Sequence, residues 1–222
     1  MELQSTIQTI SVAALPLIFA ITVHEAAHGW VASKCGDRTA LMLGRVSLNP
    51  AKHIDLFGTI ILPLIMLIMG GFIFGWAKPV PVNYSKLNHP KRDAALVALA
   101  GPAANLLMAF FWGFVAKLGF MSLHNPSLLS GSAEFFVLAG KFGVMINIVL
   151  LVLNLLPIPP LDGSRIISLL LPRHINDVYE NLERYGIWIL LLLLITGLLQ
   201  FVLIPPVYTL TDLINHLLGI GA

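Results

Sequence analysis

Two histidines and a glutamate lie inside an apolar stretch that is long enough to cross a lipid bilayer. The stretch runs from Ile7 to Val31 and contains the sequence His24-Glu25-Ala26-Ala27-His28. Ionisable side chains are costly at membrane depth, so three of them within one and a half helical turns indicate a functional site. On a helix, His24 and His28 project from one face and can bind one metal ion, with Glu25 beside it to accept a proton from bound water. The pattern predicts a zinc peptidase site inside a membrane.

The composition supports an integral membrane protein. Of the 222 residues, 57% are hydrophobic and only 11% are charged, whereas soluble domains carry about 25% charged residues. The formal net charge of +2 gives no indication of nucleic-acid binding, and the single cysteine excludes an intrachain disulfide. We expect one transmembrane domain over residues 1–222, with its core in 5–165 and C-terminal helices in 186–219.

The apolar segments predict an all-α polytopic fold with about five membrane helices. A spanning helix needs about 20 apolar residues, and the segments that qualify are 5–32, 56–76, 94–120, 134–157 and 186–204. A further piece, 206–219, follows Pro205-Pro206 and is expected to be a separate interfacial helix or a partial re-entry.

The basic residues bear on the topology of segment 56–76. If this segment spans the membrane, the basic clusters in 34–52 and 78–92 fall on opposite sides, against the positive-inside tendency. If it dips in and returns, helped by Pro63 and Gly70-Gly71, both clusters and the 160–185 loop face the cytosol. The charges favour re-entry, and a full span is the alternative.

Residues 78–83 are predicted to form a short extended segment, because Pro79 and Pro81 exclude a helix. The two prolines lie at alternate positions, so the missing amides share one edge and Val80 and Val82 can pair along the other. Such an edge could bind an unwound substrate by strand addition. The alternative is a proline-rich loop that merely joins two segments.

A catalytic zinc normally takes three protein ligands and an open position. The strongest candidate for the third ligand is Asp162, at the end of the proline-rich sequence that runs from Asn154 to Gly163. The prolines should end the fourth membrane helix and leave Asp162 on irregular backbone, where Gly163 permits a positive φ. In the re-entrant topology, Asp162 and His28 belong to the same side of the membrane.

The motifs together resemble the site-2 protease family of intramembrane zinc metalloproteases. They are the HEAAH helix, Ala100-Gly101-Pro102-Ala103-Ala104-Asn105, and the Asn154–Gly163 run; residues 44–83 are similar to the compact prokaryotic members, which lack PDZ and CBS domains. The resemblance implies one zinc ion per chain, held by His24, His28 and Asp162, with Glu25 as the catalytic acid/base.

The resemblance further implies hydrolysis of a peptide bond in or near a transmembrane segment of a membrane-protein substrate. The work of such enzymes is regulated intramembrane proteolysis or the clearance of membrane-bound remnants. The expected location is a prokaryotic cell (inner) membrane, with the active site open toward the cytosolic side.

Three further polar residues are weaker candidates. Asn105 and Asn154 are amides in apolar helices, which either bind the substrate or its oxyanion or form interhelical hydrogen bonds. His53 is either a neighbour of the metal site, a gate residue, or a polar loop histidine.

Two other classes of protein compete with the protease interpretation. A metal or proton transporter should show several polar stations and inverted repeats, and this sequence has one cluster and no repeat. A non-catalytic membrane scaffold would usually have lost Glu25 or a ligand, and none is missing here.

Overall fold

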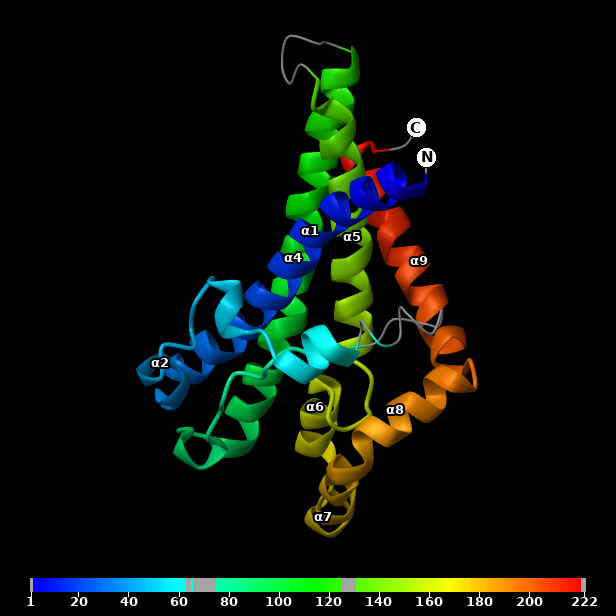
Figure 1. Ribbon diagram of the computed structural model, residues 1–222. Coiled ribbons are helices and arrows are strands. Elements are labelled where there is room, and N and C mark those ends of the chain that lie inside the picture. The colour runs from blue at the N-terminus through cyan, green and yellow to red at the C-terminus, as the bar shows by residue number, and fades with distance from the viewer. Residues whose placement is uncertain (1, 63–64, 66–74, 125–130, 221–222) are drawn as a thin grey trace. The chain divides into compact units, whose positions relative to one another are not determined.

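The computed structural model describes residues 2–62, 65, 75–124 and 131–220, and every regular element among them is a helix (Figure 1). The predicted all-α class is therefore confirmed. The chain forms two compact units: Ile21–Gly101, and Met1–Ala20 together with Pro102–Ala222. We call them the site unit and the bundle unit. Helices α1 (Glu2–Lys34) and α4 (Pro90–His124) each contribute residues to both units, and a single domain stays a prediction.

Four of the described helices are long and apolar enough to cross a membrane: Ile10–Lys34 in α1, Pro90–Leu123 in α4, Ala133–Leu155 around α5 (Ala133–Asn154), and α9 (Leu198–Leu218). The first three lie where the sequence predicted spans at 5–32, 94–120 and 134–157. The chain is therefore a polytopic membrane protein.

The prediction for the C-terminal region was wrong in where the helix breaks. A span at 186–204 and a break at Pro205-Pro206 were expected, but α8 (Gly186–Ile195) is short and α9 runs through both prolines. The break falls at Gly197, whose φ of 77° is readily adopted only by glycine. Membrane helices tolerate proline in their interior, and α9 stays helical through Pro205 and Pro206.

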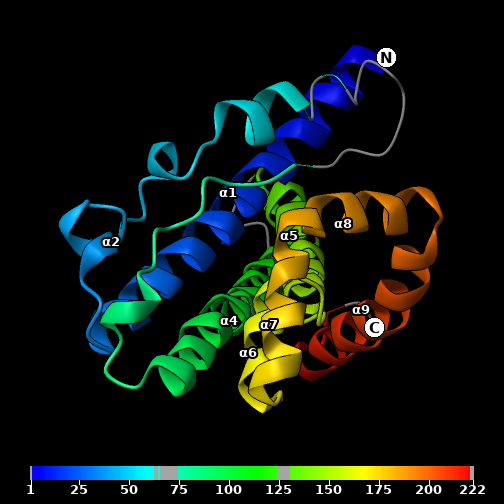
Figure 2. The same ribbon diagram turned by 90° about the horizontal axis from the view of Figure 1, so that it is seen from below.

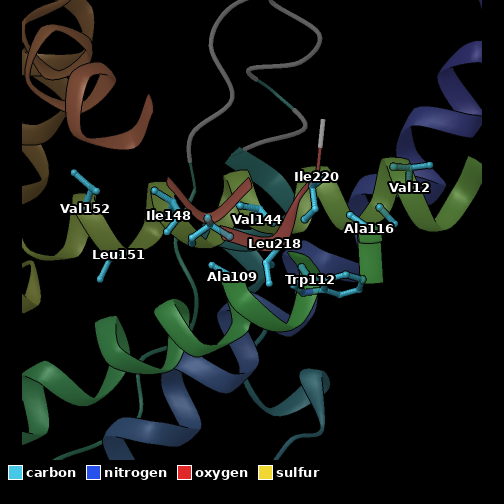
Figure 3. Close-up of a cluster of buried hydrophobic side chains, with 12 residues drawn as sticks. Val12, Ala109, Trp112, Ala116, Val144, Ile148, Leu151, Val152, Leu218 and Ile220 are labelled. Carbon is cyan, nitrogen blue, oxygen red and sulfur yellow. The ribbon is translucent and has the colours of Figure 1, made fainter. Parts of the chain in front are cut away.

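The core of the bundle unit lies between α4, α5 and α9 (Figure 3). Its largest members include Trp112 of α4 and Ile148 of α5, and Leu218 of α9 packs with them. Glycines of α5 allow close approach, because a Cβ on Gly143 would collide with the Trp112 ring. These contacts fix the three helices by packing, as expected where lipid removes the hydrophobic drive for helices to associate.

Between α5 and α8 the bundle unit contains two short helices that carry most of its polar residues in this region. Figure 2 shows α6 (Asp162–Leu170), α7 (Arg173–Asn181) and α8 following one another toward α9. Arg165 donates two hydrogen bonds to the Glu183 carboxylate, at 2.9 and 2.7 Å. This ion pair joins α6 to the short 3-10 helix Leu182–Tyr185.

The site unit contains short elements around the second half of α1. They are α2 (Thr39–Met42), the 3-10 helices Pro50–Lys52 and Tyr84–Lys86, and the π-helix Leu56–Ile61. A small core of Ala32, Leu87 and Val97 joins α1 to the start of α4. Residues 75–83 form no helix and no β-ladder, and Asn83 has extended backbone angles. The predicted absence of a helix near 78–83 is therefore confirmed, and we call residues 78–83 the extended segment.

The two ends of segment 56–76 are hydrogen-bonded to each other. The Trp76 amide donates to the carbonyl of Gly58 at 3.1 Å, and the Thr59 hydroxyl donates to the carbonyl of Trp76 at 2.8 Å. A straight helix would separate residues 58 and 76 by about 27 Å. This contact favours re-entry over a full span; residues 63–64 and 66–74 lie outside the described part of the chain.

Candidate metal centre

Helix α1 brings the two predicted imidazole ligands together. His24 and His28 are 8% and 9% exposed, and their Nε2 atoms lie 3.0 Å apart. The rings meet edge to face, with centroids 4.6 Å apart. Two nitrogens that each bind zinc at about 2.0–2.1 Å must lie within about 4 Å of each other. The pair satisfies this requirement because a spacing of four residues places both side chains on one helical face.

The backbone of α4 determines which nitrogen of His28 carries the hydrogen. The Nδ1 atom of His28 lies 2.7 Å from the carbonyl oxygen of Val97. A carbonyl only accepts, so Nδ1 carries the hydrogen, and a neutral ring then has its lone pair at Nε2. Metal-binding histidines are commonly oriented by such a bond from the other ring nitrogen.

Gly101 leaves the space that the two rings occupy. A Cβ at this position would collide with Nε2 of His28 and with the ring of His24. Glycine therefore allows α4 to pass close to the two imidazole rings. This close approach fits a metal held between α1 and its neighbours, and any larger residue would fill the space at the nitrogens.

Glu25 lies on the adjacent face of α1 and contacts the extended segment. The Val80 amide donates to Oε2 of Glu25 at 2.8 Å. Val80 is buried, and its side chain packs against Gly29, where an added Cβ would lie 2.9 Å from Cγ1 of Val80. A bond from a backbone amide to a carboxylate is charge-assisted and restricts how the carboxylate turns.

The extended segment runs beside α1 in the site unit (Figure 2), and other residues of this unit bind its backbone. At its start, the Lys78 amide donates to the carbonyl of His53 at 2.9 Å. In the middle, Nη2 of Arg45 donates to the carbonyls of Lys78 and Pro79, at 2.9 and 3.2 Å. The predicted pairing of Val80 with a substrate stays a prediction, but in this structure its amide is already used by Glu25.

Asp37 anchors the far end of the segment. This carboxylate is fully buried, and it accepts hydrogen bonds from the Asn83 amide at 2.7 Å and from the Thr39 amide at 3.0 Å. Burial by itself would raise the pKa of Asp37, but the Thr39 hydroxyl and the two amides hold the charged form, so the pKa is lowered from 3.8.

Asp162 lies in the bundle unit and differs from prediction in its local structure. It is the first residue of α6 and is half-buried, instead of lying on irregular backbone. Gly163 does not have a positive φ; a Cβ there would collide with the carbonyls of Leu155 and Leu156. Glycine is thus required for this close backbone approach. The role of Asp162 as a metal ligand stays a prediction.

The two candidate amides both donate hydrogen bonds to helix residues. Asn105 is fully buried, and its Nδ2 atom donates to the carbonyl of Ala20 at 3.3 Å and to Oδ1 of Asn147 at 3.0 Å. Nδ2 of Asn154 donates to the carbonyl of Leu150 at 3.0 Å. These bonds favour the interhelical role for Asn105, and substrate binding by either amide stays a prediction. Asn147 was missed at the sequence level.

His53 is a buried turn residue of the site unit, directly after the 3-10 helix Pro50–Lys52. It is 2% exposed, and Nε2 lies 2.9 Å from the carbonyl of Ser47. Together with its own carbonyl, which receives the Lys78 amide, this bond makes His53 part of the support for the extended segment.

Comparison with known proteins identifies the class. A sequence profile of Peptidase family M50 matches residues 12–132 and 125–196. The putative zinc metalloprotease YwhC of Bacillus subtilis is 41% identical over 195 residues, covering 86% of this chain and 83% of that protein. The putative zinc metalloprotease Rip2 of Mycolicibacterium smegmatis is 28% identical over 200 residues, which cover 82% of this chain and 66% of that protein. Rip2 of Mycobacterium tuberculosis H37Rv is 28% identical over 204 residues, which cover 91% of this chain and 74% of that protein. No solved structure matches this chain significantly.

The chain belongs to Peptidase family M50, the site-2 proteases. It is a membrane-embedded zinc metalloprotease. The close pair of histidines, the tautomer of His28 and the lack of a side chain at Gly101 fit the zinc that this family uses.

Proposed function

We propose that the chain cleaves a peptide bond in or near a transmembrane segment of a membrane-protein substrate, in regulated intramembrane proteolysis or remnant clearance. The observation that carries this proposal is the depth of the histidine pair. His24 and His28 lie ten and six residues before Lys34, at the end of the span Ile10–Lys34. On a helix this is about 15 and 9 Å from that end, within a hydrocarbon core about 30 Å thick.

The basic residues orient the proposed site. Lys34 is the last residue of α1, and Arg38, Arg45 and Lys52 follow it. By the positive-inside tendency this end faces the cytosol. The active site then opens toward the cytosolic side of the membrane, which for a prokaryotic cell is the inner membrane. The water needed for hydrolysis enters from that side.

The proposed ligands are His24, His28 and Asp162, which together offer two imidazole nitrogens and one carboxylate oxygen, a donor set typical of catalytic zinc. Zinc, when bound, supplies a Lewis acid that polarises the scissile carbonyl and acidifies water. Glu25 accepts the proton of the attacking water and transfers it to the leaving amine. The Val97 carbonyl keeps the hydrogen of His28 on Nδ1.

The extended segment is proposed to bind the unwound substrate. A helical substrate hides its peptide bonds in its own hydrogen bonds, so cleavage requires local unwinding. The Val80 amide donates to Glu25. We therefore expect the substrate backbone to pair with the Val80 carbonyl and the Val82 amide. Backbone groups two residues apart lie on the same edge of an extended chain. Val82→Pro should therefore raise KM without removing zinc.

Cleavage-site mapping tests the proposed function directly. Purified chain would be reconstituted with single-pass membrane proteins and, in parallel, with soluble unfolded polypeptides, and the products mapped by mass spectrometry. Glu25→Gln serves as the inactive control. We expect cuts within the membrane segment or a few residues from it. Cuts only in soluble polypeptides, or equal products from Glu25→Gln, would refute the proposal.

A further inference from the structure

We propose that Arg45 is a positioning residue for Glu25, acting through the backbone of Lys78–Val80. The inference rests on the proposed function, since it takes Glu25 as the acid/base. Arg45 does not contact the metal ligands in any bond described above. Its guanidinium bonds two consecutive carbonyls, and the next amide along the chain is the one that donates to Glu25.

The connection between Arg45 and Glu25 is short and stiff. Nη2 of Arg45 binds the carbonyl of Pro79 at 3.2 Å, and that carbonyl belongs to the same peptide group as the Val80 amide. The peptide bond is planar, so fixing the carbonyl oxygen fixes the direction of the N–H on the opposite side. Pro79 also has its φ restricted to about −65° by its ring. The orientation of the Val80 amide, and hence its bond to Glu25, depends on where the guanidinium is held.

Arg45 is itself held in place. Its backbone amide donates to the carbonyl of Ala40 at 2.9 Å, in the turn that ends α2. Ala40 is fully buried, and an added Cβ on Gly29 of α1 would lie 3.2 Å from it. The guanidinium therefore extends from a turn packed on the helix that carries Glu25. Arg45 and Glu25 are thus both held by α1, Arg45 through the packed turn and Glu25 directly.

The chemistry of arginine suits this role. A guanidinium stays charged at any physiological pH and presents donors in a rigid plane, so one side chain can satisfy two carbonyls at a defined angle. A lysine ammonium can donate to one or both carbonyls but without that fixed geometry. Methionine keeps much of the apolar length and removes every donor. These differences predict a graded series among substitutions at position 45.

Loss of Arg45 should lower kcat more than it changes KM. A misplaced catalytic group is costly even when the displacement is about 1 Å, with losses of about 100-fold documented for such shifts. We expect Arg45→Met to reduce kcat by about 10- to 100-fold, with KM within about 2-fold of wild type. Zinc content should stay at the wild-type value, because the histidines and their Val97 partner are not touched.

Amide hydrogen exchange supplies a readout that does not depend on activity. Within residues 78–82, Pro79 and Pro81 have no amide hydrogen, so a peptide covering this range reports on Lys78, Val80 and Val82 alone. Arg45→Met should speed exchange in this peptide. Glu25→Ala removes the acceptor of the Val80 amide and should speed exchange in the same peptide. Arg38→Met is the matched control, because Arg38 is exposed and caps α2 without a side-chain hydrogen bond.

The test compares wild type, Arg45→Met, Arg45→Lys, Arg38→Met and Glu25→Gln for zinc content, kcat, KM and exchange over 78–82. Faster exchange and lower kcat in Arg45→Met, with partial recovery in Arg45→Lys and no change in Arg38→Met, would support the proposal. If Arg45→Met fails to fold, Arg45→Lys carries the test, and its kcat must fall below wild type at unchanged zinc content. Wild-type kcat or wild-type exchange in the folded variants would overturn it.

The two proposals fail in different ways. Full activity in Glu25→Gln would refute the acid/base assignment itself, whatever the Arg45 variants do. An inactive Glu25→Gln beside a wild-type Arg45→Met would leave the proposed function standing and overturn only the role of Arg45.

Discussion

The carbonyl oxygen of Val97 lies 2.7 Å from Nδ1 of His28, so a backbone atom of α4 determines which nitrogen of the imidazole is available to a metal. The contact joins residues 69 positions apart in the chain. Because the acceptor is a backbone atom, it persists whatever side chain stands at position 97. The orientation of the His28 ring thus depends on how closely α4 approaches α1, and that approach depends on Gly101.

Gly101→Ala should reduce zinc binding, although the substitution adds only one methyl group. The new methyl group would occupy the space at Nε2 of His28 and at the ring of His24. We expect zinc content to fall well below one per chain, and cleavage to fall with it. Ala103→Val is the matched control, because Ala103 is exposed on the same helix. Metal analysis of both purified variants checks the prediction, and wild-type zinc content in Gly101→Ala would contradict it.

Glu25→Gln should separate metal binding from catalysis. Glutamine keeps an oxygen that can accept the Val80 amide but cannot take a proton from water. General acid/base groups contribute about 10²- to 10⁴-fold to rate, so we expect a loss of that size with zinc retained. His24→Ala should lose both zinc and activity. Parallel metal analysis and cleavage assays measure the two effects, and a zinc-free Glu25→Gln would show that this residue acts in metal binding instead.

Asp37 should stabilise the site unit in a pH-dependent way. Its pKa is lowered in the folded chain, so its contribution is present above the unfolded value of about 3.8 and is lost as pH falls through the folded pKa. Hydrogen bonds to a charged group are worth about 1.5–3 kcal/mol, and Asp37→Asn should cost stability of that order at pH 7.

The measurement is the thermal midpoint of wild type and Asp37→Asn in detergent between pH 7 and 3. The difference between them should shrink as pH falls below about 4. Asp177→Asn, at an exposed position of α7, controls for the loss of one charge. A difference that stays constant with pH would contradict the charge-based explanation.

The buried amide pair in the bundle unit should show coupled substitutions. Asn147 accepts from Asn105 and donates to the carbonyl of Gly143 at 2.8 Å. Interhelical hydrogen bonds in membranes average about 0.6 kcal/mol and reach about 1.7 kcal/mol, so each single change to leucine should destabilise by about 1 kcal/mol. The double variant should cost less than the sum, because no unpaired amide is left. Strict additivity in chemical unfolding would contradict the pairing.

The parts of the site that local spacing determines could be predicted from the sequence. The HEAAH pair needs only the helical repeat, and α1, α4 and α5 follow from long apolar runs. The break at Gly197 was missed because a proline pair in an apolar run looks like a stronger break than a glycine, although lipid-facing helices tolerate proline.

The bond between Val80 and Glu25 could not be predicted, since it joins residues 55 positions apart through a backbone amide. Neither Arg45 nor Asp37 gave a sequence signal, because both act on backbone atoms. The one available hint was the alternation of Pro79 and Pro81, which marked the segment but not its partners.

The central claim is that His24, His28 and Asp162 hold one zinc ion within the membrane. X-ray absorption at the zinc edge, on purified wild type and on Asp162→Ala, tests it most directly. We predict one zinc per chain with two imidazole nitrogens and oxygen ligands, and weakened zinc binding in Asp162→Ala with the imidazole signal retained in any remaining metal. A wild-type chain without zinc, a zinc site without imidazole, or an unchanged spectrum and affinity in Asp162→Ala would contradict the account.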